Sequence, residues 1–213
     1  MIEIKKFTFN PIQENTYLLY DETRECILVD AGCYFDDEKE ELDRFIAENN
    51  LKPVLLVNTH CHFDHLLGVN YCRYKYKVDF LIPEGESSLV DWTVGQGDLF
   101  GVPTEPIDAA DGELREGEKI KFGNSELHII KAEGHSPGGL VLHHPGQKFL
   151  LAGDVLFYGS IGRTDLPGGS FERLVNNICT KLLVLPPETV VYSGHGPETS
   201  IGFEKENNPF LTD

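Results

Sequence analysis

The stretch N-T-H-C-H-F-D-H-L-L-G, residues 58–68, places three histidines and one aspartate within six positions. It follows an apolar run, P-V-L-L-V-N, that is typical of a buried strand. In an extended segment, side chains two residues apart lie on the same side. His60 and His62 can therefore reach one metal ion, while Cys61 is expected to point away and pack beneath the loop.

The last two polar residues of this stretch, Asp64 and His65, are adjacent and are expected to serve a second ion close to the first. Catalytic zinc-like sites take three protein ligands and leave one position open, and paired catalytic ions lie about 3.5–4 Å apart. Three imidazoles and a carboxylate within so few residues suit neither a core nor a solvated loop. The stretch therefore predicts a metal centre.

Three later apolar runs end in the same way, with a glycine followed by a histidine or an aspartate. They are A-E-G-H at 132–135, A-G-D at 152–154 and S-G-H at 193–195. Glycine permits a sharp change of backbone direction, which would turn His135, Asp154 and His195 over the edge of a sheet. Three other histidines lack such a setting and are expected to be ordinary structural or surface residues: His128, His143 and His144.

The composition indicates one soluble globular domain spanning residues 1–213, and the strands and helices predicted below make it an α+β domain. The chain is 40% hydrophobic, and its 21 glycines and 12 prolines are typical of many short elements joined by turns. No apolar stretch is long enough for a membrane span, and the N-terminus does not resemble a signal peptide. Five cysteines without a C-x-x-C pair indicate reduced thiols in a cytoplasmic protein. A net charge of −17 argues against nucleic-acid or anionic-membrane partners.

The periodicity predicts two halves that each run from strands through a helix to another strand. Expected strands lie at residues 2–9, 15–20, 26–30, 53–58, 78–82, 119–122, 126–131, 139–144, 148–152 and 189–193. Expected helices lie at residues 36–49, 65–75, 84–94 and 170–183, and residues 95–111 are expected to be mostly loop.

Together these residues resemble the metallo-β-lactamase-fold hydrolases. The resemblance rests on T-H-C-H-F-D-H (59–65), G-H-S-P-G-G (134–139), G-D-V-L-F (153–157) and S-G-H-G (193–196). It implies an αββα four-layer sandwich, with two mixed sheets face to face and helices on the outer faces. Two further stretches look like the glyoxalase II-like (hydroxyacylglutathione hydrolase-like) branch: S-I-G-R-T-D-L-P-G-G (160–169) and T-S-I-G-F-E-K-E-N-N-P-F (199–210).

The resemblance also divides seven ligands between two divalent ions. It implies His60, His62 and His135 on one ion, Asp64, His65 and His195 on the other, and Asp154 as a bridge. Zinc is the expected metal, with iron or manganese as alternatives. Asp64, as a weak ligand, is the expected catalytic residue that orients or accepts the proton of the attacking water.

The implied reaction is attack of a bridging hydroxide on the carbonyl of a thioester, S-lactoylglutathione or a related small acyl thioester. Known glyoxalase II enzymes bind glutathione with a C-terminal helical domain, and residues 196–213 do not supply one. Arg163 is the candidate for substrate binding, and an ion pair with Asp165 is its competing structural role. A mononuclear iron persulfide dioxygenase of the same fold is the alternative function, with His60, His135 and Asp154 as the ligand set.

Overall fold

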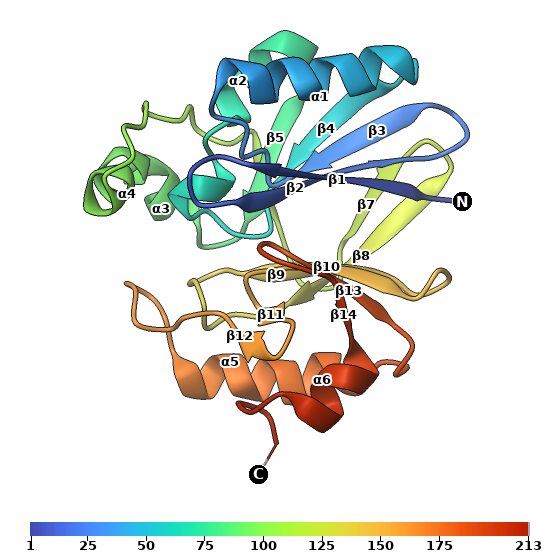
Figure 1. The fold of residues 1–213 in the computed structure, drawn as a ribbon, viewed down its shortest axis with the longest axis vertical. Helices are drawn as coiled ribbons and strands as arrows, with labels where there is room; N and C mark the ends of the chain where they lie inside the picture. Colours follow the sequence, from blue (N-terminus) through green and yellow to red (C-terminus); the bar gives the residue numbers. More distant parts are fainter. Residues whose placement is uncertain (213) are drawn as a thin grey trace.

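Two six-stranded sheets lie face to face in the computed structural model, which describes residues 1–212 (Figure 1). The first sheet has the order β1-β2-β3-β4-β5-β6. Its strands are β1 (Glu3–Phe9), β2 (Glu14–Tyr20), β3 (Glu25–Val29), β4 (Lys52–Val57), β5 (Asp79–Pro83) and β6 (Gly112–Leu114). β1, β2 and β3 pair antiparallel and β3 to β6 pair parallel, so the sheet is mixed.

The second sheet, also mixed, has the order β14-β13-β10-β9-β8-β7. Its strands are β7 (Lys119–Phe122), β8 (Ser125–Lys131), β9 (Leu140–His144), β10 (Phe149–Gly153), β13 (Val190–Ser193) and β14 (Thr199–Ser200). Only β10 and β13 pair parallel, and the other neighbours are antiparallel. A small hairpin, β11 (Leu156–Phe157) with β12 (Ser160–Ile161), follows β10.

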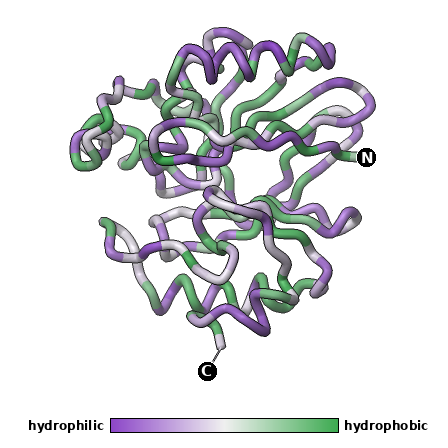
Figure 2. The backbone as a smooth tube through the Cα atoms, in the orientation of Figure 1, coloured by the Kyte–Doolittle hydropathy of each residue, from purple (hydrophilic) through white to green (hydrophobic). Residues whose placement is uncertain are grey.

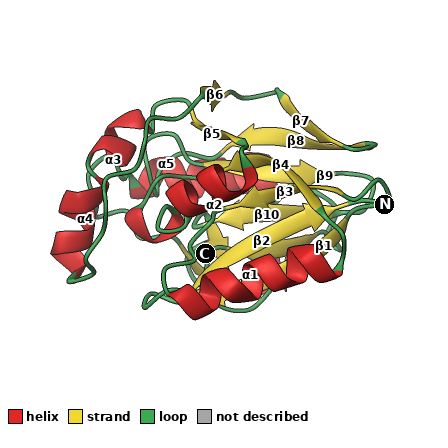
Figure 3. Cartoon of the chain, turned by 90° about the horizontal axis from the view of Figure 1, so that it is seen from above, coloured by secondary structure: helices red, strands yellow, loops and turns green. Residues whose placement is uncertain are grey.

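Helices cover the outer face of each sheet. α1 (Asp36–Glu48) and α2 (Val69–Tyr76) lie over the first sheet, and α5 (Phe171–Asn177), its π-helical continuation Ile178–Leu182 and α6 (Ile201–Asn207) lie over the second (Figure 1). α3 (Ser87–Asp91) and α4 (Thr93–Phe100) project to one side (Figure 3). This is the four-layer αββα arrangement, so the predicted fold class is confirmed.

Alternating side chains in the strands build three apolar layers. On β2, Leu19 faces the second sheet, where it joins Leu142 and Leu151, while Leu18 faces Leu42 of α1. A third layer lies between the second sheet and its helices. Because both faces of the inner strands are buried, their sequences are continuously apolar. Figure 2 shows this as hydrophobic strands inside and hydrophilic outer helix faces.

One predicted loop is partly helical, so the interpretation of residues 95–111 as mostly loop was wrong at its start. The predicted helix at 84–94 is two short helices, α3 and α4, and α4 extends to Phe100. Gly95 and Gly97 disfavour a helix in sequence-based reasoning. In the structure they permit close packing, because a Cβ at Gly95 would lie 2.0 Å from Trp92 Nε1 and one at Gly97 would lie 2.5 Å from the Val102 carbonyl oxygen.

The helix predicted at 65–75 begins later, at Val69, because a 3-10 turn (η1, Phe63–His65) occupies the preceding residues. The short elements β6, β11, β12, β14 and α6 were not predicted. Within residues 1–212, no helix is both long and apolar enough to cross a membrane. All five cysteines are free.

A buried carboxylate joins the two sheets at the end away from the histidines. Asp21, after β2, accepts hydrogen bonds from Thr23, from the backbone N–H of Asn124 in the β7–β8 turn (2.7 Å) and from the hydroxyl of Ser125 at the start of β8 (2.8 Å). Burial by itself raises the pKa of Asp21, but these hydrogen bonds outweigh it and lower the pKa to about 2. Asp21 is therefore expected to stabilise the fold as an anion.

We expect Asp21→Asn to lower the free energy of unfolding by about 2 kcal/mol at pH 7, because an amide group cannot accept all of these hydrogen bonds. Since the folded pKa lies below the ordinary value of 3.8, the stabilisation is present above about pH 4 and is lost as the pH falls toward 2. Urea unfolding at several pH values measures the difference. Asp79→Asn, at an exposed carboxylate, is the control, and an equal loss in both variants would contradict this role.

Candidate metal centre

The seven predicted ligand residues come together at one edge of the sandwich. They come from the loop after β4, from η1, and from the segments that follow β8, β10 and β13: His60, His62, Asp64, His65, His135, Asp154 and His195. Four strands of two sheets thus end at the same place. The structure brings all seven side chains together, and their role as metal ligands stays a prediction.

His60, His62 and His135 form one group of potential ligands. His135 Nε2 lies 3.3 Å from His60 Nε2 and 2.8 Å from His62 Nδ1. Two nitrogens on one tetrahedral zinc ion are separated by about 3.3 Å, given Zn–N bonds of about 2.0–2.1 Å. The spacing of His60 and His135 therefore suits a shared ion.

Asp64, His65 and His195 form a second group. Asp64 Oδ2 lies 3.1 Å from His195 Nε2 and 3.7 Å from His65 Nε2. Asp154 lies between the two groups. Its carboxylate oxygens are 3.5 Å from His65 Nε2 and 3.6 Å from the Nε2 atoms of both His135 and His195. One carboxylate can thus reach ions held by either group.

Backbone and side-chain partners fix which ring nitrogen faces the cluster. His135 Nδ1–H donates to the Arg163 carbonyl oxygen (2.8 Å), and His195 Nδ1–H donates to that of Gln13 (3.2 Å). His65 Nδ1 faces Asp30 Oδ2 at 3.3 Å. Because the Nδ1 atoms of His135 and His195 are hydrogen-bonded in this way, their Nε2 lone pairs are left for the centre, which is how metal-binding histidines are usually oriented.

Burial keeps two of the imidazoles in the form that binds metals. Burial and then the neighbouring His135 lower the pKa of His62 to about 3, and burial followed by His65 also lowers the pKa of His60. Both rings are therefore neutral at pH 7, with a free lone pair. Several buried atoms of the cluster have no hydrogen-bond partner within residues 1–212, among them His65 Nε2 and Asp154 Oδ1. Unpaired donor atoms of these types fit a divalent ion.

Buried polar residues that sequence reasoning missed hold the ligand loop. Asp30, at the end of β3, accepts hydrogen bonds from Thr59 N (2.7 Å) and Thr59 Oγ1 (2.6 Å). Asn58 Nδ2 donates to the carbonyl oxygens of His60 (3.0 Å) and His65 (2.9 Å). The signal for Asp30 was present, because C-I-L-V-D is also an apolar run that ends in a potential ligand.

Two acidic residues of this frame had no signal in the sequence. Glu86 accepts hydrogen bonds from the N–H groups of Cys61 (2.8 Å) and Gly138 (2.6 Å), and it thereby joins the loops after β4 and β8. Its pKa is raised by burial. Glu14 is fully buried, with Oε1 3.8 Å from His65 Nδ1. Neither glutamate stands at a strand end followed by a turn, so periodicity did not distinguish them.

Glycines precede three of the ligands, and the geometry at each position requires a glycine. Gly153 has φ of 47°, and a Cβ there would lie 2.2 Å from Thr59 Oγ1. Gly194 does not have a positive φ, but a Cβ there would lie 2.2 Å from Asp154 Oδ1. The predicted change of backbone direction is thus confirmed before Asp154 and also before His135, where Gly134 has φ of 130°, whereas close approach explains the glycine before His195.

Two other residues singled out in the sequence, Cys61 and Arg163, lie beside the predicted ligands. Cys61 is buried in the layer beneath α1 and α2, and burial raises the pKa of its thiol, so the prediction that it packs beneath the loop is confirmed. Arg163 lines the cavity beside the metal centre, but its guanidinium donates to Asp165 at 2.7 and 2.8 Å. The structural ion pair is present, and a role of Arg163 in substrate binding stays a prediction.

A cavity of about 240 Å³ opens onto the cluster, and its wall away from the metal ligands is mostly apolar. It is lined by Ile12, His62, Phe63, Asp64, Gln96, Phe100, His135, Asp154, Arg163, Leu166 and His195.

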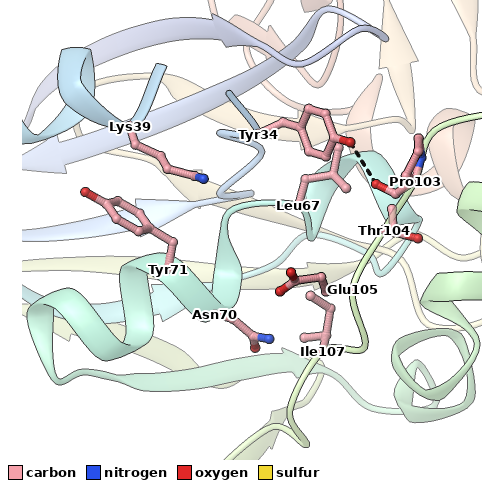
Figure 4. Close-up of a pocket in the computed structure, with 9 residues that line it drawn as sticks. All are labelled: Tyr34, Lys39, Leu67, Asn70, Tyr71, Pro103, Thr104, Glu105 and Ile107. Atoms are coloured by element: carbon pink, nitrogen blue, oxygen red, sulfur yellow. Dashed lines mark hydrogen bonds between the residues drawn. The ribbon is translucent and has the colours of Figure 1, made fainter. Parts of the chain in front are cut away.

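A larger cavity of about 380 Å³ lies between α1, α2 and the segment after α4 (Figure 4). It contains none of the predicted ligands, and Figure 4 shows the Tyr34 hydroxyl donating to the Pro103 carbonyl oxygen at one side of it. His128, His143 and His144 lie on β8 and β9, outside the site.

Two curated proteins are similar to this chain over nearly its whole length. The probable metallo-hydrolase YqgX of Bacillus subtilis is 36% identical, over 97% of this chain and 96% of its own. The hydroxyacylglutathione hydrolase GloC of Haemophilus influenzae is 34% identical over 93% of both chains.

Two solved structures are similar over nearly the whole length of this chain. The BLEG-1 B3 metallo-beta-lactamase superposes with a TM-score of 0.91 at 36% identity, covering 99% of this chain and 100% of that one. TTHA1623, solved in a di-iron-bound form, gives a TM-score of 0.88 at 33% identity, covering 97% of this chain and 100% of that one. The profile of the metallo-beta-lactamase superfamily matches residues 9–195, a range that contains every predicted ligand. The chain therefore belongs to the metallo-beta-lactamase superfamily.

Proposed function

We propose that this chain is a metal-dependent hydrolase that uses two divalent ions to cleave small acyl thioesters. The observation that carries the proposal is the convergence of two three-residue groups of donors, with Asp154 within 3.6 Å of members of both. The names of the relatives support the reaction class, since one is a probable metallo-hydrolase and another a hydroxyacylglutathione hydrolase. Zinc is the proposed metal, and the di-iron form of TTHA1623 keeps iron as an alternative.

His60, His62 and His135 would hold one ion, Asp64, His65 and His195 the other, and Asp154 would bridge them. The ions would supply a hydroxide at neutral pH and polarise the carbonyl of the substrate. Asp64 lines the cavity, and its Oδ2 lies 3.1 Å from His195 Nε2, so its carboxylate is placed to orient the attacking water and take its proton. Phe63 lines the same cavity.

The leaving group favours a thioester over an amide. A thiolate departs as a stable anion, whereas an amide nitrogen must be protonated as it leaves. Among the described residues that line the cavity, the only carboxylates are Asp64 and Asp154, and both belong to the cluster. The cavity thus offers no separate acid for an amide, which supports hydrolysis of a thioester.

The second group of donors distinguishes this proposal from a mononuclear iron dioxygenase. A site with one iron needs two histidines and one carboxylate. In this chain Asp64, His65 and His195 form a further group of adjacent donors that such a site would leave without a role. We therefore infer that two ions are bound.

Metal analysis of protein purified without added metal is expected to find about two equivalents of a divalent metal per chain. The same protein should hydrolyse acyl thioesters, followed by release of the free thiol, and should not consume oxygen with a persulfide. One equivalent of iron, persulfide-dependent oxygen uptake and no thiol release would replace the proposal with the dioxygenase.

Replacing the proposed bridge, Asp154→Ala, should remove both ions and lower kcat/KM by about a thousandfold or more, since metal ions contribute several kcal/mol of transition-state stabilisation. Asp91→Ala, at an exposed residue that ends α3, is the matched control and should retain metal and activity. Circular dichroism establishes that both variants fold. Two bound ions and full activity in Asp154→Ala would refute the bridging role.

A further inference from the structure

The cavity at the metal centre continues into an apolar groove along α3 and α4. A narrow space of about 20 Å³ adjoins it, lined by His62, Leu89, Trp92, Gln96, Leu99, Phe100, Leu166 and Pro167. Four of these residues line the metal-centre cavity as well: His62, Gln96, Phe100 and Leu166. The groove therefore shares a wall with the metal-centre cavity, and one of the proposed ligands is part of that wall.

The groove has large apolar side chains that remain partly exposed to solvent among the described residues. The exposed fractions are 40% for Trp92, 68% for Leu99 and 43% for Phe100. Figure 2 shows hydrophobic and hydrophilic residues mixed along α4 at the outer end of the molecule, and Figure 1 places α4 on the same side as the segment that leads into α5. Exposed apolar clusters beside a site commonly mark a surface that binds a ligand.

Specific contacts fix this wall to the loop that carries the ligands. The ring of Phe100 stacks on that of Phe63, with centroids 5.2 Å apart and an interplanar angle of 25°. Gln96 Nε2 donates to the carbonyl oxygens of Leu89 (2.9 Å) and Cys61 (3.4 Å), so α4 is hydrogen-bonded to the metal-binding loop. A preformed apolar wall at a fixed place relative to the metal centre can select among substrates.

Charge in the site disfavours an anionic group in this groove. Among the residues that line the two cavities, Arg163 is the only permanent cation, and Asp165 holds its guanidinium with two hydrogen bonds. The groove itself is lined by apolar residues apart from His62 and Gln96. A carboxylate or phosphate would lose its hydration there without gaining a partner, whereas an alkyl chain would gain from leaving water.

We propose that this groove is the acyl subsite, and that the enzyme prefers thioesters with apolar acyl chains longer than a lactoyl group. The inference rests on the proposed function for the thioester itself. The carbonyl lies at the metal centre, the alkyl chain runs along Phe100 toward Trp92 and Leu99, and the thiol portion lies toward solvent. Leu99 and Trp92 thus determine acyl specificity without touching the reacting atoms.

Binding of alkyl hydroxamic acids to the metal-loaded protein tests the subsite without relying on thioester hydrolysis. The hydroxamate group chelates metal ions, and its alkyl chain then samples the groove. Because Trp92 is the single tryptophan, its fluorescence reports binding in the groove. From acetohydroxamic to octanohydroxamic acid, the Kd should fall about two- to fourfold for each added methylene while the chain remains in contact with the wall.

Two variants of α4 distinguish an effect on the groove from a general effect of changing the helix. Leu99→Ser should abolish most of the gain per methylene, because it removes an apolar part of the wall. Val94→Ser makes a similar change at an exposed residue of the same helix that lines neither cavity, and it should keep the gain. Equal gains in Leu99→Ser and the unmodified protein would overturn the inference.

Hydrolysis of N-acetylcysteamine thioesters, from acetyl to octanoyl, completes the test. A rise of kcat/KM with chain length, reduced by Leu99→Ser, supports the acyl subsite. If no thioester is cleaved but the hydroxamate series still shows the gain, the proposed function fails and the apolar subsite stands. Hydrolysis without a chain-length effect, together with an unresponsive Trp92, overturns the subsite. A dimer that Leu99→Ser converts to a monomer, with no effect on chain length, would assign this face to a second copy instead.

Discussion

The burial of His65 among carboxylates is the constraint on which the rest of the site depends. The side chain is completely buried, with Asp30 3.3 Å from Nδ1 and Asp154 3.5 Å from Nε2. Burial opposes its protonated form, but the nearby Asp64 and Asp154 outweigh this effect and raise the pKa of His65. Buried charges of one sign are costly unless they are balanced. The charges of the acids and imidazoles in the cluster therefore depend on one another. A divalent cation would balance the buried carboxylates as a protonated imidazole does.

This constraint explains the arrangement of the sandwich around it. Asp30 follows β3, His65 follows β4, and Asp154 follows β10, so both sheets must supply residues to one place. The hydrogen bonds from Thr59 to Asp30 and the glycine at position 153 permit the close approach of these segments. The apolar layers hold the sheets together, and the polar frame at their edge sets the position of each ligand. A rigid frame of this kind preorganises a catalytic site.

The fold class and the ligand candidates could be predicted because their signals are local. Alternating and continuous apolar runs gave the main strands, and strand ends with Gly-His or Gly-Asp pointed to His135, Asp154 and His195. Reasoning from the sequence failed at α4, where Gly95 and Gly97 suggested a loop. There, close packing against Trp92 and Val102 outweighs the low helix propensity of glycine, and the sequence pattern does not reveal such contacts.

The sequence by itself determined which side chains can bind metal, because ligand type and spacing are properties of short segments. Only the tertiary structure placed Glu14 beside His65, Glu86 between two loops, and Phe100 on Phe63. These pairs are far apart along the chain, or join elements whose relative orientation no local pattern fixes. They meet because two sheets bury a common apolar layer, and that packing decides which polar atoms and apolar walls surround the metal centre.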